Sequence, residues 1–177
     1  MATLVFVHAH PDDEASQSSG TMARAVAEGH RVVLVYATNG DHGDVPPDLP
    51  EGQSLVERRR AEAACSAAVI GTHRVVWLGY ADSGMTGWDQ NLHEASLMQA
   101  QVEDVAMLIA EVLREEQADL VIGYDWHGGY GHPDHVKVHH ATRRAAELAG
   151  TPRYLEGTLN RDSIRRLYES AVAAGQM

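Results

Sequence analysis

Short apolar runs alternate with longer helical patterns along this chain, and this alternation limits the fold more than any other feature of the sequence. Each run has the length and the content of β-branched residues that are typical of a buried strand. Strands that alternate with helices form right-handed βαβ units around a parallel sheet. We therefore predict an α/β fold, a Rossmann-like three-layer sandwich with a mainly parallel sheet. The predicted strands cover residues 2–7, 31–37, 74–78 and 119–123, with a short one at 153–159.

Signals for the beginnings and ends of helices lie between these strands. Gly29 and Gly71 follow two helical patterns, as glycine does at many helix C-termini. Ser54, with Glu57 three residues later, forms a capping-box pattern. We find no internal repeat or interdomain linker, so the 177 residues are expected to form one domain over 1–177. The predicted helices cover 15–29, 54–70, 96–116 and 133–148, and a last helix begins at Arg161.

The composition argues against several classes of partner. The formal net charge is −11, and the 14 basic residues form no cluster beyond 58–60, so a nucleic acid would meet net repulsion. No apolar run reaches membrane-spanning length and the N-terminus lacks a signal-peptide pattern, so we expect a cytoplasmic protein. Cys65 is the only cysteine and lies in a helical pattern, where we expect a buried structural thiol.

Two short motifs crowd histidines and carboxylates around a proline, and each follows a predicted strand. They are residues 10–14 (HPDDE) and 132–135 (HPDH). Either motif alone is more often a turn, with proline in the first helical turn and aspartate capping the helix. Two such motifs at strand ends favour a functional site, because the groups that act on a ligand lie at the carboxyl ends of parallel strands.

The residue types in the two motifs suit a catalytic metal ion. His10 and Asp13 lie three residues apart, and His135 would supply a third ligand. Two imidazoles and one carboxylate leave a fourth position on zinc for water, whose pKa zinc lowers to roughly 7. The same ligand set also suits ferrous iron.

Three further residues of the motifs are candidates for proton transfer. Asp12 lies beside two of the ligands and could accept the proton of the attacking water. His132 could stabilise an oxyanion or donate a proton to a leaving amine. Asp134 is expected to orient His132, as carboxylates often do for histidine.

The two motifs together resemble the PIG-L/LmbE family of zinc-dependent N-deacetylases, which remove acetyl groups from N-acetylglucosamine-containing compounds. The resemblance implies that His10, Asp13 and His135 bind zinc. It also implies that Asp12 is the general base and that His132, partnered by Asp134, stabilises the oxyanion and acts as an acid.

Further matches resemble a mycothiol-pathway subgroup of that family. Tyr130 is similar to a tyrosine that helps to polarise the amide carbonyl. Arg59 aligns with a substrate-binding arginine, although a solvated helix face is an equal alternative. Asp82 and Met85 resemble residues that line the sugar pocket, although Asp82 before Ser-Gly also suits a plain turn. Asp41 lies in a similar family loop, where an Asx turn is the simpler interpretation.

Two features depart from the family pattern. His139 lies four residues after His135 on the same helix face, and a fourth ligand there would close the zinc site, so we expect a surface histidine or one that supports a ligand. Family members commonly exceed two hundred residues, with a C-terminal part that shapes the substrate pocket. A truncated chain, a naturally short member and a chain that needs a partner subunit all fit this length. A homo-oligomer is also left open.

We therefore expect hydrolysis of an N-acetyl group from a small amino-sugar compound. One alternative is a mycothiol S-conjugate amidase or an N-acyl glycoside deacylase on the same scaffold. The other is a protein that binds a metal or a sugar without turnover. A nucleotide-binding reading is weaker, because the first strand leads into HPDDE and not into a GxGxxG pattern. The remaining histidines are expected to be structural, except His127, which lies close enough to the second motif to line the site.

Overall fold

The computed structural model describes residues 1–157, and its centre is a five-stranded sheet in which all neighbouring strands are parallel. The order of the strands is β3-β2-β1-β4-β5, so the predicted α/β fold with a mainly parallel sheet is confirmed. The predicted helix from Arg161 and the end of the last predicted strand lie outside the described residues. The strands are β1 (Thr3–His8), β2 (Arg31–Thr38), β3 (Arg74–Tyr80), β4 (Leu120–Tyr124) and β5 (Tyr154–Gly157).

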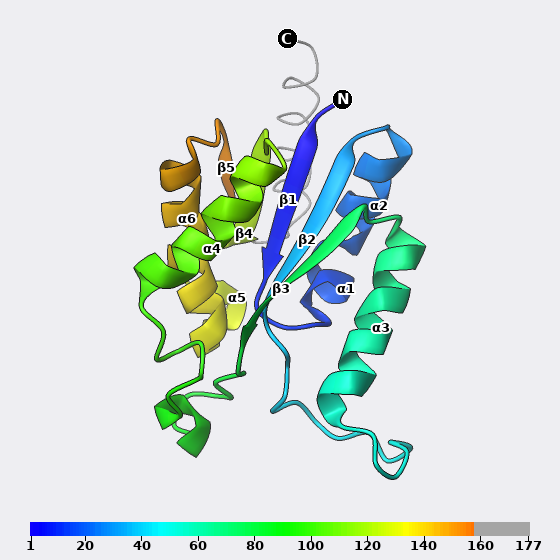
Figure 1. Cartoon of the computed structure of the whole chain (residues 1–177), viewed down its shortest axis with the longest axis vertical. Helices are drawn as coiled ribbons and strands as arrows, with labels where there is room; N and C mark the ends of the chain where they lie inside the picture. Colours follow the sequence, from blue (N-terminus) through cyan, green and yellow to red (C-terminus); the bar gives the residue numbers. More distant parts are fainter. Residues whose placement is uncertain (158–177) are drawn as a thin grey trace.

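Helices cover both faces of the sheet, which gives the three predicted layers (Figure 1). Alternate side chains of a strand point to opposite faces. In β1, Val5 and Val7 therefore pack in a core with α4 and α6, whereas Leu4 and Phe6 pack on the other side with α2 and α3. The helices are α1 (Asp13–Gln17), α2 (Ser19–Ala27), α3 (Leu55–Ile70), α4 (Val102–Glu115), α5 (Gly128–Gly131) and α6 (Pro133–Ala149), with a 3₁₀ helix η1 (Asp89–Leu92).

Two of the predicted helices differ from those observed. The helix predicted at 15–29 is divided into α1 and α2 at Ser18, whose hydroxyl lies 2.8 Å from Nε2 of His8. The helix predicted at 96–116 begins only at Val102. Leu97 is fully buried, and its N–H donates to the carbonyl of Ala81 (3.0 Å), so this stretch lies beside the segment after β3. Buried contacts with the sheet outweigh local helix propensity in both places.

Helix α3 confirms one prediction and corrects another. The capping box is present, because the Ser54 hydroxyl accepts from the Glu57 N–H and the Glu57 carboxylate accepts from the Ser54 N–H. The prediction of a buried Cys65 is wrong, since the thiol is exposed. The helical pattern alone did not show which side of α3 faces the core.

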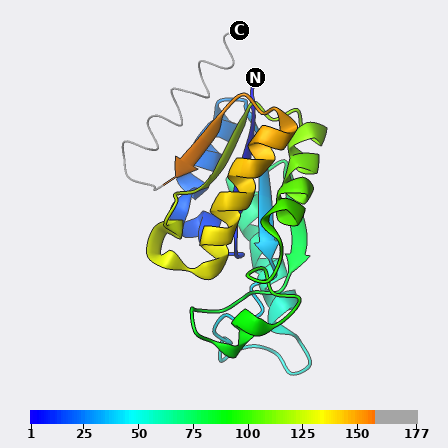
Figure 2. The same cartoon turned by 90° about the vertical axis from the view of Figure 1, so that its left-hand side faces the viewer.

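The strand order places a crevice at the carboxyl ends of β1 and β4. The chain moves outward from β1 to β2 and β3, then returns across β1 to form β4, so the connections diverge between these two strands. Ligands of open α/β sheets bind at such switch points. The loops after β2 and β3 extend beyond the same edge of the sheet (Figures 1 and 2). No helix within residues 1–157 is both long enough and apolar enough to cross a lipid bilayer.

Candidate metal centre and active-site pocket

The first motif turns sharply at the end of β1 and brings Asp13 back over the strand. The N–H of His10 donates to Oδ2 of Asp13 at 2.8 Å, and the Tyr124 hydroxyl donates to the same oxygen at 2.5 Å. Gln17, one helical turn after Asp13, donates to Oδ1 at 3.1 Å. Burial raises the pKa of Asp13, but hydrogen bonds with His10 and His135 outweigh it and hold the pKa well below its usual value. Asp13 is therefore a fixed, ionised carboxylate.

His10, Asp13 and His135 come together although the two motifs are far apart in the sequence. Nδ1 of His10 lies 3.2 Å from Nε2 of His135 and 3.4 Å from Oδ2 of Asp13, while Nε2 of His135 lies 3.4 Å from Oδ1 of Asp13. Ligands at zinc distances of about 2.05 Å in a tetrahedron are separated by about 3.3 Å. The three groups have donor types that suit a divalent cation and lie close to this spacing, with the two distances to Asp13 ending on its two different oxygens.

His135 is oriented for such a role by the peptide that precedes α6. Its Nδ1 lies 3.1 Å from the carbonyl oxygen of Gly128, which can only accept, so the proton is on Nδ1 and Nε2 keeps its lone pair. Gly128 has a φ of 64°, and a Cβ there would lie 2.7 Å from Cβ of His135. A residue without a side chain is needed for this close approach.

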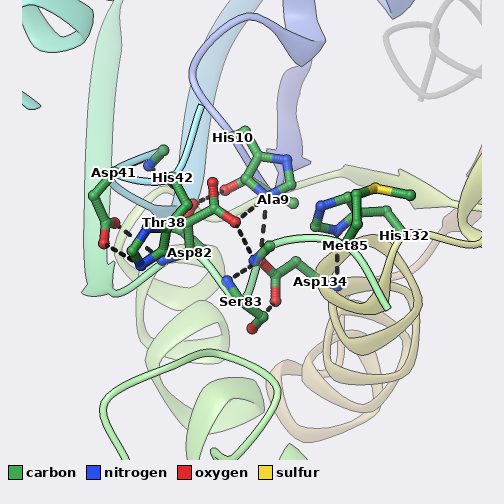
Figure 3. Close-up of polar contacts among 12 residues, drawn as sticks. Ala9, His10, Thr38, Asp41, His42, Asp82, Ser83, Met85, His132 and Asp134 are labelled. Atoms are coloured by element: carbon green, nitrogen blue, oxygen red, sulfur yellow. Dashed lines mark hydrogen bonds and ion pairs between the residues drawn. The ribbon is translucent and has the colours of Figure 1, made fainter. Parts of the chain in front are cut away.

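The carboxylate of Asp134 supports His10 rather than His132, which differs from the sequence-based expectation. Its Oδ2 lies 3.1 Å from Nε2 of His10 and also accepts the N–H of Ser83, while its Oδ1 accepts the Ser83 hydroxyl (Figure 3). Burial lowers the pKa of His10, but hydrogen bonds with Asp13, Asp134 and Asp82 raise it well above its usual value. The same negative surroundings would stabilise a bound cation.

His132 is held by the backbone and not by a side-chain carboxylate. As the N-cap of α6, it accepts the N–H of Asp134 on Nδ1 at 3.2 Å. Burial lowers the pKa of His132 to about 4, and the nearby His10 contributes to the shift. At neutral pH the ring is therefore an uncharged imidazole with its proton on Nε2. Its centroid lies 4.6 Å from that of His10.

Asp12 lies beside this cluster and is paired with an arginine from α3. Nη2 of Arg59 donates to Oδ2 of Asp12 at 2.6 Å, and Nη1 donates to the carbonyl of Gly40 at 3.0 Å. A Cβ at Gly40 would lie 2.2 Å from Nη1, so the loop can approach the guanidinium only with glycine there. Partial burial raises the pKa of Asp12, and Arg59 opposes the shift. Arg59 thus belongs to the site and not to a solvated helix face.

These groups face a cavity of ≈ 320 Å³. Arg59, Asp82 and Met85, the predicted substrate contacts, line it together with Tyr130, which was predicted to polarise the amide carbonyl. The Tyr130 side chain is largely exposed, and partial burial raises the pKa of its hydroxyl, which is therefore protonated at neutral pH. Further lining comes from His10, Asp12, Asp13, His42, Gly43, Asp44, Gly84, Trp88 and His132.

Other candidate residues support the site or lie apart from its cavity. Asp41 accepts the N–H of Asp82 at 3.0 Å and so holds the loop after β3. His139 is buried, with Nδ1 3.0 Å from the Tyr124 carbonyl oxygen. His127 is exposed and lies outside the cavity lining within the described residues. His8 is buried against Ser18, in agreement with the packed role expected for it.

Sequence reasoning missed His42 and Asp44 of the lining, and it also missed three residues with identifiable contacts in this region. Tyr124 positions Asp13, and its ring stacks on His135 with centroids 4.2 Å apart. Ser83 holds Asp134, and Trp88 lines the cavity. Tyr124 is the last residue of β4, so its place at the strand end was a usable signal. The contacts of Ser83 and Trp88 depend on the path of the loop at 81–100, for which the sequence offers no pattern.

Comparisons with known proteins agree with this geometry. The sequence profile of a family described as GlcNAc-PI de-N-acetylase (PIG-L) matches residues 5–146. The chain belongs to this family. A Thermomonospora curvata protein named 1D-myo-inositol 2-acetamido-2-deoxy-alpha-D-glucopyranoside deacetylase is 43% identical over 166 residues, covering 87% of this chain and 55% of its own length. A Thermobifida fusca protein of the same name is 40% identical, covering 98% of this chain and 66% of its own.

A solved structure supports the same relationship. N,N'-diacetylchitobiose deacetylase from Pyrococcus horikoshii superimposes with a TM-score of 0.66 and 27% identity, covering 85% of this chain and 51% of that chain. The present chain spans about half to two thirds of the length of the curated relatives that it matches. The range that the family profile matches includes both motifs, since it runs from β1 into α6.

Proposed function

We propose that this chain catalyses zinc-dependent hydrolysis of the N-acetyl group of a small N-acetylglucosamine-containing molecule. The observation that carries the proposal is the close approach of His10, Asp13 and His135, whose nitrogen and carboxylate oxygen atoms lie 3.2–3.4 Å apart, beside a polar cavity that His10 and Asp13 line. Relatives at about 40% identity are named as deacetylases of an amino-sugar inositol compound, which supports the substrate class.

In this proposal His10, Asp13 and His135 hold the ion through Nδ1, a carboxylate oxygen and Nε2. Zinc would supply a Lewis acid and a water of lowered pKa. Asp12, Asp44 and Asp82 also line the cavity without binding the ion in this proposal, and of these Asp12 directly precedes the ligand Asp13 and has a side chain that is 61% exposed. Asp12 would take the proton of the attacking water. Ferrous iron suits the same donors, and metal analysis of the purified protein decides between the two.

Two hydrogen-bond donors would stabilise the charge that develops on the amide oxygen. The neutral His132 presents Nε2–H, because its Nδ1 is occupied by the Asp134 N–H. The Tyr130 hydroxyl lines the same cavity, and its ring lies edge-on to His132 with centroids 6.1 Å apart. Donors of this kind contribute most when they are held in place before the reaction, as the N-cap of α6 holds His132.

The remaining cavity residues would bind the sugar. Asp82 has a pKa lowered below its usual range, since hydrogen bonding with His10 outweighs the effect of its burial, so it offers a charged acceptor for hydroxyl groups. Arg59 offers guanidinium donors, and Met85 an apolar edge. A sugar needs this combination, because its hydroxyls require polar partners while its C–H faces pack on apolar groups.

The test is hydrolysis of the sugar N-acyl amide by the purified protein, loaded with zinc or with iron, followed by mass spectrometry of the deacylated amine and by an acetate assay across a panel of N-acylated amino-sugar compounds. The panel includes free N-acetylglucosamine, its inositol glycoside, a mycothiol S-conjugate and an N-acylated glycopeptide. Acetate from the small amino sugars supports the proposal, and turnover restricted to the conjugate or the glycopeptide supports the amidase or deacylase alternative. Bound metal without turnover of any compound would support a non-catalytic binding protein.

A further inference from the structure

The backbone of Asp12 has an unusual conformation for a residue with a side chain. Its φ is 144° and its ψ is −21°, in a region that L-amino acids rarely adopt. Such a conformation is strained and persists only where the surrounding structure holds it. Asp12 is also the residue before α1, and its carbonyl accepts the N–H of Ala15 at 3.0 Å. The strained conformation therefore also requires a contact that holds the N–H of Asp12.

Glu14 provides that contact. It is 1% exposed, and Oε2 of its carboxylate accepts the N–H of Asp12 at 3.2 Å. The second oxygen, Oε1, accepts the hydroxyl of Ser66 at 2.6 Å. Glu14 lies outside the lining of the metal cavity within the described residues, so it has no direct access to a substrate there. Burying a carboxylate is costly unless its hydrogen bonds are satisfied, and here each oxygen has a donor.

Ser66 connects this contact to the helix that carries Arg59. The two residues are seven positions apart on α3, which is about two helical turns, so they lie on the same side of the helix. Arg59 holds the Asp12 carboxylate from that side, and Ser66 holds the Asp12 peptide through Glu14. Helix α3 therefore contacts the Asp12 carboxylate directly, through Arg59, and supports the Asp12 N–H indirectly, through Ser66 and Glu14.

We propose that Glu14 and Ser66 are positioning residues that hold the Asp12 backbone in its strained conformation and thereby aim its carboxylate at the metal-facing side of the cavity. The inference rests on the proposed function, in which Asp12 is the general base. It gives a function to Ser66 of α3 and to the buried carboxylate of Glu14, which neither binds the metal in this proposal nor lines the cavity.

The first experiment compares Ser66→Ala with the wild-type protein loaded with zinc. We expect kcat to fall about tenfold with KM and zinc content unchanged, because small displacements of a catalytic group lower the rate more than the binding. Ser66→Thr keeps a hydroxyl and should restore most of kcat. Cys65→Ala is the matched control, since this exposed neighbour on α3 has no part in the contact. An unchanged kcat in Ser66→Ala, or an equal fall with the control, would overturn the inference.

The second experiment does not depend on turnover. In the wild-type protein the amide of Asp12 should exchange slowly with solvent, and in Ser66→Ala it should exchange at least about tenfold faster. The Met22 amide, which donates to the Ser18 carbonyl in the adjoining turn, should be unaffected. If the wild-type protein released no acetate, the proposed function would be wrong. If the Asp12 amide exchanged equally fast in both proteins, the positioning role of Ser66 would be wrong while the proposed function remained.

Discussion

The carboxylate of Asp134 lies 3.1 Å from Nε2 of His10, on the side of the ring opposite the nitrogen that faces His135 and Asp13. A carboxylate accepts only, so this contact fixes the proton on Nε2 and leaves Nδ1 free to bind a cation. Histidine ligands are commonly oriented in this way by a carboxylate. Asp134 therefore supports the metal centre through His10, whereas His132 is oriented by the backbone N–H of Asp134.

Asp134→Asn should weaken metal binding. The amide oxygen can still accept from Nε2 of His10 and from the Ser83 N–H, which share Oδ2, but it carries no charge and is a weaker acceptor, so it stabilises the His10 ring and a bound cation less. We expect zinc affinity to fall about 10–100-fold, the usual effect of losing such a partner. Competition with a chelator measures it. Asp104→Asn, an exposed change on α4, is the control, and equal affinities in all three proteins would refute the assignment.

Asp12→Asn should abolish most turnover while leaving the metal in place. The carboxylate of Asp12 is not one of the three proposed ligands, so the ligands remain, but an amide cannot accept the proton of the attacking water. We expect kcat to fall about 10²–10⁴-fold, the range of general base catalysis. Acetate release and metal content, measured on the same preparation, check it. Near-normal kcat with a matched substrate would show that another group is the base.

The site could be anticipated in the sequence where a motif is anchored to regular structure. His10, Asp13 and His135 each follow a strand that the apolar pattern predicts, and the parallel sheet brings those strand ends together. The residues that support them could not be found in the same way. The partner of Asp134 was misassigned, because whether its carboxylate turns to His132 or to His10 depends on the loop that carries Ser83.

Helix boundaries show the same limit. The N-terminus of α3 was predicted correctly because its capping box is a local interaction between Ser54 and Glu57. The break between α1 and α2 was not, because it involves a hydrogen bond of Ser18 with His8 from a different element. The late start of α4 likewise follows from the burial of Leu97 beside the segment after β3, which no local pattern shows.

Trp88→Ala should weaken substrate binding more than it lowers turnover. This side chain is 49% exposed, lines the cavity and packs over Gly84. An aromatic face beside polar groups suits the C–H face of a sugar ring. We expect KM to rise about tenfold with kcat within about twofold. Trp126→Ala, at an exposed tryptophan outside the cavity, should leave both constants unchanged, and an equal effect of both variants would contradict this role.

Glu116 should make stability depend on pH through an ion pair far from the catalytic site. Its carboxylate, 7% exposed, accepts from Nε of Arg31 at 2.6 Å and from Nη1 of Arg74 at 2.8 Å. Hydrogen bonding with Arg31, assisted by Arg74, lowers the pKa of Glu116 in the folded protein. The stabilisation is therefore complete above the pKa of the unfolded chain, about 4.3, and is lost as the pH falls through the lower folded-state value.

Glu116→Gln tests this dependence. At pH 7 the variant should lose about 1–2 kcal/mol of unfolding free energy, since the hydrogen bonds to two arginines become uncharged on one side. Urea denaturation between pH 7 and pH 3 should show the difference from wild type shrinking below about pH 4.3, as the unfolded glutamate becomes protonated. Glu111→Gln, at an exposed position of α4, should show no such difference at either pH. A destabilisation by Glu116→Gln that stays constant across this range would mean that packing, and not the charge of Glu116, holds Arg31 and Arg74 in place.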